Sequence, residues 1–179
     1  MFLARKITRP KWEQQATVEP GEIAADAVTV DLRTTGNTLS FWTCESVEDA
    51  RLKEVVLALA ANGDRIDKFD IAWLAEETIR AAGIKLTVTD GATPVVRLVK
   101  RHMDIERIDL VRLGKVATLI HAAISEGSHK RLTKAEVQQV LVAAVQAGDL
   151  RIEDLKEGLR GELNKALEKT SANKTGGGG

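Results

Sequence analysis

The chain has 179 residues, of which 44% are hydrophobic and 29% are charged. A chain of this length can bury about two-thirds of its unfolded surface, so we expect it to fold without disulfides, as one domain or two small ones. Its 26 basic and 26 acidic residues cancel, which excludes a strong overall attraction to nucleic acid or anionic lipid. Aromatic residues make up only 3% of the chain, which argues against a stacking platform for single-stranded nucleic acid.

The apolar stretches and the cysteine content indicate where the protein resides. The longest apolar runs, residues 55–61 and 140–145, are much shorter than the roughly 20 residues that a membrane-spanning helix needs. No signal peptide opens the chain, and the single cysteine, Cys44, can form no disulfide within it. We therefore expect a soluble cytoplasmic protein.

A two-residue alternation of apolar and polar side chains predicts strands in the first 45 residues. The first strand covers residues 2–8 and ends before Pro10, which lacks a backbone donor. Alternation returns at residues 27–33 and again at 39–44, and the segment 34–37 between them has turn chemistry. These two runs predict a β-hairpin.

The period changes from two residues to three and four near Ser46, where helical spacing begins. Ser46 offers an N-cap oxygen, and the first predicted helix stops at residues 62–63, which are Asn and Gly. A second helix is predicted to begin at Asp67 or Asp70 and to end at Gly83.

The middle of the chain predicts one further strand and two helices. Residues 84–89 alternate and can join the N-terminal sheet as a fourth strand. Thr93 followed by Pro94 predicts a helix start, and this helix carries apolar spacing as far as His102. Another helix is expected over residues 109–126.

The last part of the chain predicts two helices and a tail. Thr133 and Glu136 have the spacing of a capping box, and the helix that they open ends at Gly148. The final helix, residues 152–169, has a narrow apolar stripe on an otherwise charged cylinder. Residues 171–179 are too polar and glycine-rich to bury apolar surface, which indicates a disordered linker or an expression remnant.

These elements predict an α+β fold, in which a small antiparallel N-terminal sheet packs on a mainly helical body. The sheet consists of the first strand and the hairpin, and it can take residues 84–89 as a fourth strand. We divide the chain into a β-rich region at residues 1–45, a mainly helical region at 46–170 and the tail at 171–179.

No sequence motif indicates an active site or a bound cofactor. Phosphate-binding loops, dinucleotide fingerprints and nucleophile elbows do not occur, and the three histidines, His102, His121 and His129, lack the spacing of metal ligands. Cys44 is interpreted as a small apolar side chain on a half-buried strand. An enzyme ranks third among the functions considered, because it would require Cys44, a histidine and a carboxylate in one pocket.

The narrow stripe of the final helix suggests a surface for another protein. A stripe one residue wide forms a weak core but fits a groove or a coiled-coil partner. The same pattern is equally expected if the helix closes the protein's own core. We predict a non-catalytic protein-protein interaction module, a small accessory or regulatory subunit that binds a partner protein or itself. The predicted contact residues are Leu155, Leu159, Leu163 and Leu167.

Basic residues in the middle of the chain carry the alternative function, association with nucleic acid. Such a patch would contact phosphates, with a strong dependence on salt. Acidic residues interrupt the segment, which favours a solvated, ion-paired surface. The candidate phosphate-contacting residues are Arg97, Lys100, Arg101, Arg107, Arg112 and Lys115.

Overall fold

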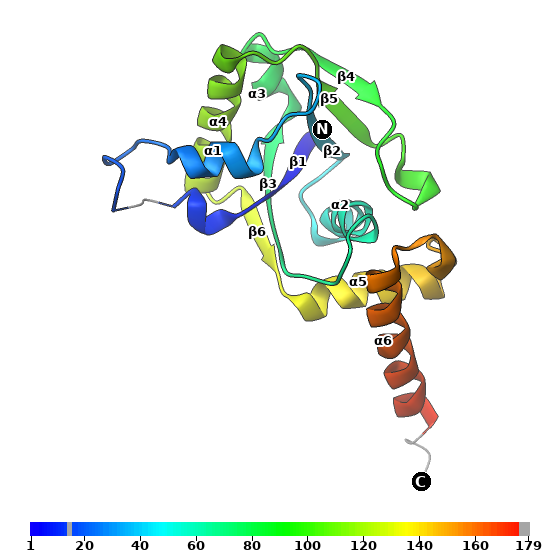
Figure 1. Ribbon diagram of the computed structural model, residues 1–179. Helices are drawn as coiled ribbons and strands as arrows, with labels where there is room; N and C mark the ends of the chain where they lie inside the picture. Colours follow the sequence, from blue (N-terminus) through cyan, green and yellow to red (C-terminus); the bar gives the residue numbers. More distant parts are fainter. Residues whose placement is uncertain (14–15, 176–179) are drawn as a thin grey trace.

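The computed structural model describes residues 1–13 and 16–175 (Figure 1). Over these residues, six strands form one antiparallel sheet, and helices cover both of its faces, which confirms the α+β fold. The strand order is β4-β5-β2-β1-β3-β6. The strands are β1 (Phe2–Ile7), β2 (Leu39–Cys44), β3 (Phe69–Ala75), β4 (Leu86–Thr89), β5 (His102–Ile105) and β6 (His129–Leu132).

The helices form a layer on each side of the sheet. The α-helices are α1 (Ala25–Asp31), α2 (Asp49–Ala61), α3 (Glu76–Ala81), α4 (Leu110–Ser125), α5 (Lys134–Gln146) and α6 (Glu157–Thr175). Three short 3-10 helices are η1 (Arg9–Lys11), η2 (Val96–Leu98) and η3 (Ile152–Asp154). Within the described residues, none of the helices is both long and apolar enough to cross a membrane.

Alternation along the strands divides the buried side chains into two cores. Leu3 and Phe41 belong to the core under α1, α3 and α4, which we call the α4 face. Their neighbours Ala4 and Trp42 belong to the core under α2, α5 and α6, which we call the α2 face. Figure 1 shows these two groups of helices on opposite sides of the strands. Each strand residue therefore contributes to one core or the other.

The predicted hairpin is wrong, because residues 27–33 do not form a strand. They lie mostly in α1, where Ala27 and Asp31, four residues apart, are both buried, whereas Val30 is 49% exposed. A spacing of four residues is helical, and it overrides the local alternation. The turn after it is confirmed, since Gly36 and Asn37 both have positive φ. Strand β2 pairs with β1 and β5 instead of a hairpin partner.

The helix predicted from Asp67 or Asp70 is also wrong over most of its length. Residues 69–75 form β3, and the only helix in this stretch is the short α3 that follows. Strand β3 lies between β1 and β6 and has buried residues on both faces. Such a strand shows no alternation in its sequence, so the apolar spacing of three and four was coincidental. Gly83 ends α3 with positive φ, as expected.

The segment after Pro94 is not the predicted α-helix. It forms the single 3-10 turn η2, in which Val96 is exposed and Leu98 is buried, and then continues into β5. The strand predicted at residues 84–89 is confirmed as β4. It joins the sheet through β5. Four strands, β3 to β6, therefore come from the region that we expected to be mainly helical, and only β4 among them was predicted.

Three of the predicted helices are confirmed, with changes at their ends. The N-cap of α2 is Glu48 and not Ser46. The side chain of Asp109 caps α4 by accepting from the backbone N–H of Arg112. The capping box at the start of α5 is present with both of its hydrogen bonds.

The final helix begins later and continues further than its predicted range. Residues 152–154 form η3, and α6 runs from Glu157 to Thr175, so the first part of the predicted tail is helical. Residues 176–179 lie outside the described residues. Gly158 lets α6 approach the turn before β3, because a Cβ at this position would lie 2.6 Å from the carbonyl oxygen of Asp64.

The sheet opens at one end, between its two central strands. β1 pairs with β2 only through residues 2–4, whereas it pairs with β3 along its whole length. The Arg5 side chain fills the gap, donating from Nε to the carbonyl of Asp31 (2.7 Å) and from Nη1 to the carbonyl of Ser40. Burial lowers the pKa of Arg5 to about 10, although the nearby carboxylates of Asp31 and Asp104 act to raise it. Arg5 thus replaces missing strand pairing with side-chain hydrogen bonds.

Candidate functional site

The two outermost strands of the sheet, β4 and β6, differ in their chemistry. β4 has the sequence Leu-Thr-Val-Thr, without a charged side chain, and among the described strands it pairs only with β5. Val88 is 59% exposed. A short uncharged edge of this composition is available to pair with another strand.

The hydrogen bonds of β5 determine which backbone groups of β4 are free. The backbone N–H of Thr43 donates to the carbonyl of Arg101 (3.0 Å), so the backbone N–H and C=O groups of Arg101 face β2. In an antiparallel ladder this orientation alternates along the strand. The backbone groups of Met103 therefore face β2, and those of His102 and Asp104 face β4.

Two residues of β4 consequently present their backbone groups to the open edge. Thr89 lies opposite His102, and Thr87 lies opposite Asp104, so these two threonines make the ladder with β5. Leu86 and Val88 point their N–H and C=O groups away from β5. The open edge of β4 therefore offers two donors and two acceptors, the pattern that a further strand requires.

The other edge, β6, is protected by charge. Its sequence is His-Lys-Arg-Leu. Lys130 pairs with Asp49 of α2 (Nζ to Oδ1, 2.6 Å), and Arg131 makes a two-pronged contact with Asp70 of β3 (2.7 and 3.0 Å). Consecutive cations on an edge strand oppose the approach of a second copy by like-charge repulsion.

A chain of polar side chains holds β4 against β5 and β2. The Asp104 carboxylate accepts from the hydroxyl of Ser40 (2.7 Å) and from the hydroxyl of Thr89 (2.9 Å). The Thr89 oxygen also lies 2.8 Å from Nδ1 of His102. Because the only hydroxyl proton of Thr89 goes to the carboxylate, we assign the proton of this contact to Nδ1 of His102. Burial lowers the pKa of His102, opposed by the attraction of Asp104.

The turn after β4 packs tightly against the same network. The Trp42 and His102 rings meet edge to face, with centroids 5.1 Å apart. Gly91 lies directly on them, because a Cβ there would be 2.4 Å from Cη2 of Trp42 and 2.9 Å from Cβ of His102. Its N–H donates to the carbonyl of Val99 (2.8 Å). The end of β4 is therefore held in place by close packing and hydrogen bonds.

One polar atom of β4 lacks a partner. The hydroxyl oxygen of Thr87 is buried and has no hydrogen bond to any of the described residues. The side chain is on the α2 face, next to the satisfied network of Thr89 and Asp104. A buried hydroxyl without a partner is uncommon in folded proteins, and a change of the Thr87 side-chain rotamer would allow it to take one.

The predicted contact leucines lie inside the molecule. Leu155, Leu159 and Leu163 are buried in the core of the α2 face, and Leu167 packs against that core partly buried. They join α6 to α5 and α2 within one chain. The sequence left open whether this helix binds a partner or closes the protein's own core. In this structure it closes the protein's own core.

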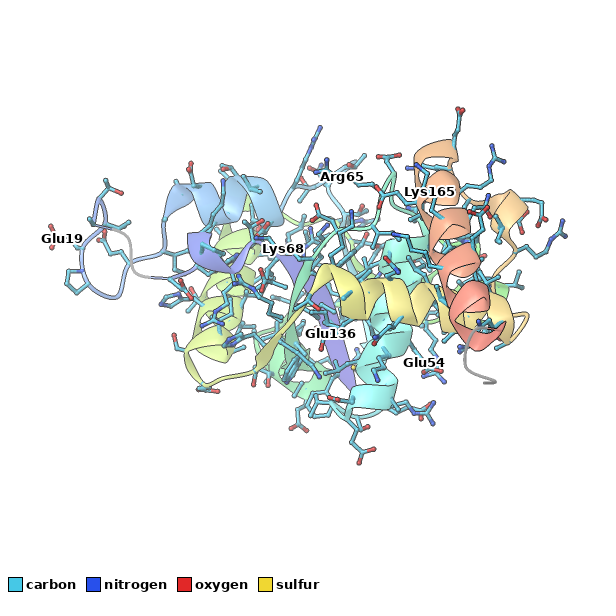
Figure 2. All side chains as sticks on the ribbon, turned by 90° about the horizontal axis from the view of Figure 1, so that it is seen from below. Glu19, Glu54, Arg65, Lys68, Glu136 and Lys165 are labelled. Atoms are coloured by element: carbon cyan, nitrogen blue, oxygen red, sulfur yellow. The ribbon has the colours of Figure 1, made fainter. Side chains whose placement is uncertain are left out.

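The six predicted phosphate-contacting residues do not form one patch. Arg97 and Arg101 both reach Glu54 of α2, at 2.8 and 3.9 Å, whereas Arg112 and Lys115 belong to α4 on the opposite face of the sheet. Figure 2 shows Glu54 on α2.

Ion pairs and hydrogen bonds engage most of these cations. Arg97 also contacts Asp149, and this hydrogen bond raises the pKa of Arg97. Lys100 pairs with Asp90. Arg112 pairs with Asp109 (2.7 Å), and Lys115 donates to the carbonyl of Ala82. Arg107 lies in a turn with positive φ, and its carbonyl accepts from Arg112.

Within the part of the chain that the structure describes, no hydrogen bond joins Cys44 to a histidine. Cys44 is buried on the α2 face, and burial raises the pKa of its thiol to about 11, so the thiolate is scarce at neutral pH. Among the described residues, the core cluster that contains Cys44 is built from apolar side chains. His102 serves the β4 network, and His121 and His129 each have a buried Nδ1 without a partner among the described residues.

Comparisons with known proteins give no guidance on function. No protein-family model, curated protein or solved structure matches this chain. The candidate site therefore rests on its own geometry. The sequence contains one signal for it, the alternation of residues 84–89, but the position of that strand at an edge depends on β5, which the sequence does not predict as a strand.

Proposed function

We propose that this protein is a non-catalytic interaction module that binds another polypeptide as an added strand along β4. The observation that carries the proposal is the row of outward N–H and C=O groups on Leu86 and Val88. Strand addition uses such a row for affinity and the alternating side chains for specificity. The absence of charge on the strand removes the usual obstacle to pairing.

Other exposed apolar side chains support a contact surface less directly. Val96, Leu110 and Val111 are well exposed, but they lie in η2 and in the first turn of α4. They offer apolar side chains without a row of free strand groups. The rigid support of β4 also favours this edge, because a pre-ordered strand loses little conformational entropy when it binds.

The proposal is tested with extended peptides. Twelve-residue peptides selected from a random phage-displayed library on the immobilised protein are synthesised with a fluorophore, and their binding is measured by anisotropy. We expect the selected peptides to bind the wild-type protein and to bind Val88→Pro at least about tenfold more weakly. The reason is that proline removes the outward donor of residue 88 and places a ring at the edge.

Val88→Thr is the matched control, because it keeps the backbone donor and the β-branched shape. It is expected to bind the peptides as the wild type does. Nuclear magnetic resonance supplies the location: the amide protons of Leu86 and Val88 should become protected from exchange when peptide is added. Peptides that bind Val88→Pro with unchanged affinity, or a library that yields no binder at a protein concentration where the chain is monomeric, would contradict the proposal.

A further inference from the structure

We propose that the strand added to β4 is β4 of a second copy of this chain, paired antiparallel about a two-fold axis at Thr87. This inference rests on the proposed function and names the partner for the same edge. Two copies related by a two-fold axis perpendicular to the sheet place their edge strands antiparallel, as all the strands of this sheet already are. The result is one continuous sheet across two molecules.

The register at Thr87 uses every outward backbone group of the strand. It places Leu86 of each copy opposite Val88 of the other. These are the two residues whose N–H and C=O groups face the open edge, so each pair exchanges two hydrogen bonds. A register centred on Val88 would instead place Leu86 opposite Asp90, whose carboxylate is bound to Lys100. The sequence Leu-Thr-Val-Thr is thus self-complementary in the register centred on Thr87.

The side chains fit the same register. Leu86 and Val88 meet on the α4 face as an apolar pair, one buried and one exposed. The two Thr87 residues meet on the α2 face at a position without backbone hydrogen bonds, where opposite side chains approach most closely. Threonine pairs across antiparallel strands form hydrogen bonds. After rotation about its Cα–Cβ bond, the unpartnered hydroxyl of Thr87 gains a partner in this way.

Electrostatics permit the pairing at β4 and oppose it at β6. The chain has no net charge, so two copies do not repel each other at long range. β4 adds no local repulsion, whereas β6 would bring Lys130 and Arg131 against their counterparts. Because four residues a side form a small contact, the dimer should be reversible and concentration-dependent.

Sedimentation over a range of protein concentrations tests self-association. The wild type should shift from monomer to dimer as concentration rises, Val88→Thr should behave in the same way, and Val88→Pro should stay monomeric. Proline is tolerated here by the monomer because the N–H of residue 88 makes no bond to β5. Circular dichroism and thermal unfolding of Val88→Pro verify that it is folded.

Disulfide cross-linking tests the register. In the proposed pairing the Cα atoms of the two residues 87 are about 4.5 Å apart, within the range of a disulfide. Thr87→Cys should therefore form a covalent dimer on mild oxidation. Thr89→Cys, whose counterpart lies roughly 14 Å away along the strand, should not. Cys44 is buried with a thiol pKa of about 11, so it does not compete.

The outcomes separate this inference from the proposed function. Peptides can bind the wild type and lose affinity for Val88→Pro while the protein remains a monomer at every concentration. In that case the β4 edge binds polypeptides, but a second copy is not its partner. If a dimer forms but persists in Val88→Pro, or if Thr87→Cys does not cross-link, the interface lies elsewhere and the inference is wrong. If neither peptide nor second copy binds, both proposals fail.

Discussion

The two edges of the sheet have opposite chemistry, although they belong to the same fold. β6 carries consecutive basic side chains that are bound to acids of α2 and β3. β4 carries none, and its exposed Val88 and outward backbone groups are left open. Edge strands that are not protected tend to associate. The difference indicates that one edge is kept closed to pairing and the other is available for it.

The two edge strands also differ in what holds them. Strand β6 leads directly into α5, which packs with α2 and α6 on the α2 face. Strand β4 is held by the network of Thr89, His102 and Asp104 and by the close packing of Gly91. The comparison is therefore between a charged edge strand that continues into a packed helix and an uncharged one that is held by polar contacts to β5.

The largest expected effect comes from weakening the helical layer on the α2 face. Leu163 of α6 is fully buried in the core of the α2 face. Leu163→Ala should lower the free energy of unfolding by about 2–5 kcal/mol, because it creates a cavity. Urea denaturation measures the change, and Leu167→Ala, at a partly buried position, should lose less. Equal losses at both positions would contradict the observed packing.

The support behind β4 is tested by Gly91→Ala. The added Cβ collides with the Trp42 ring and with His102, so the substitution should destabilise the protein by about 1–3 kcal/mol. Gly114→Ala is the control: nothing lies within 4 Å of its new Cβ, and the higher helix propensity of alanine should stabilise α4 by up to about 1 kcal/mol. Thermal unfolding of both variants measures the difference, and a neutral Gly91→Ala would show that β4 is loosely held.

The charges on β6 should differ in importance. Asp70 is buried, so Arg131→Ala leaves a buried carboxylate without its cation and should lower the melting temperature by a few degrees. Lys130→Ala removes a pair with an exposed acid, Asp49, and should have a much smaller effect. Differential scanning calorimetry compares the two variants. A larger loss for Lys130→Ala would reverse the assignment of their roles.

The smallest effect concerns the histidine behind β4. Burial lowers the pKa of His102 below its usual 6.5, so the unfolded chain binds this proton first as pH falls. The stability that depends on neutral His102 is present above pH 6.5 and is lost progressively below it. His102→Gln should flatten this decline of unfolding free energy between pH 6.5 and pH 5. An unchanged slope would indicate that His102 is not the group responsible.

End signals in the sequence mark some helices correctly, but the signal at Thr93 and Pro94 precedes only a 3-10 turn. The capping box of Thr133 and Glu136 and the N-terminal acid of α4 lie at the starts of confirmed helices. The predictions fail where a strand is buried on both faces or where a helix is short. Strand β3 is buried on both faces, and α1 has only seven residues, too few for its period to be distinguished from alternation.

The candidate site could be predicted only in part. The strand at residues 84–89 was predicted, but its place at an edge follows from the insertion of β5 between it and β2, a long-range pairing that local sequence does not specify. The leucine stripe of α6 has the same sequence pattern whether the helix packs on its own chain or on another. Which of the two occurs depends on the shape of α5 and α2, and this shape arises only in the folded molecule.

The central position of β1 has a consequence for synthesis of the chain. β1 leaves the ribosome before both of its neighbours, β2 and β3, and its register with β3 joins Phe2 to Ala75. At typical translation speeds of about 5–20 residues per second, β1 waits several seconds for this second neighbour. Until then the backbone groups that later pair with β3 have no partner strand, so the centre of the sheet is completed late in synthesis.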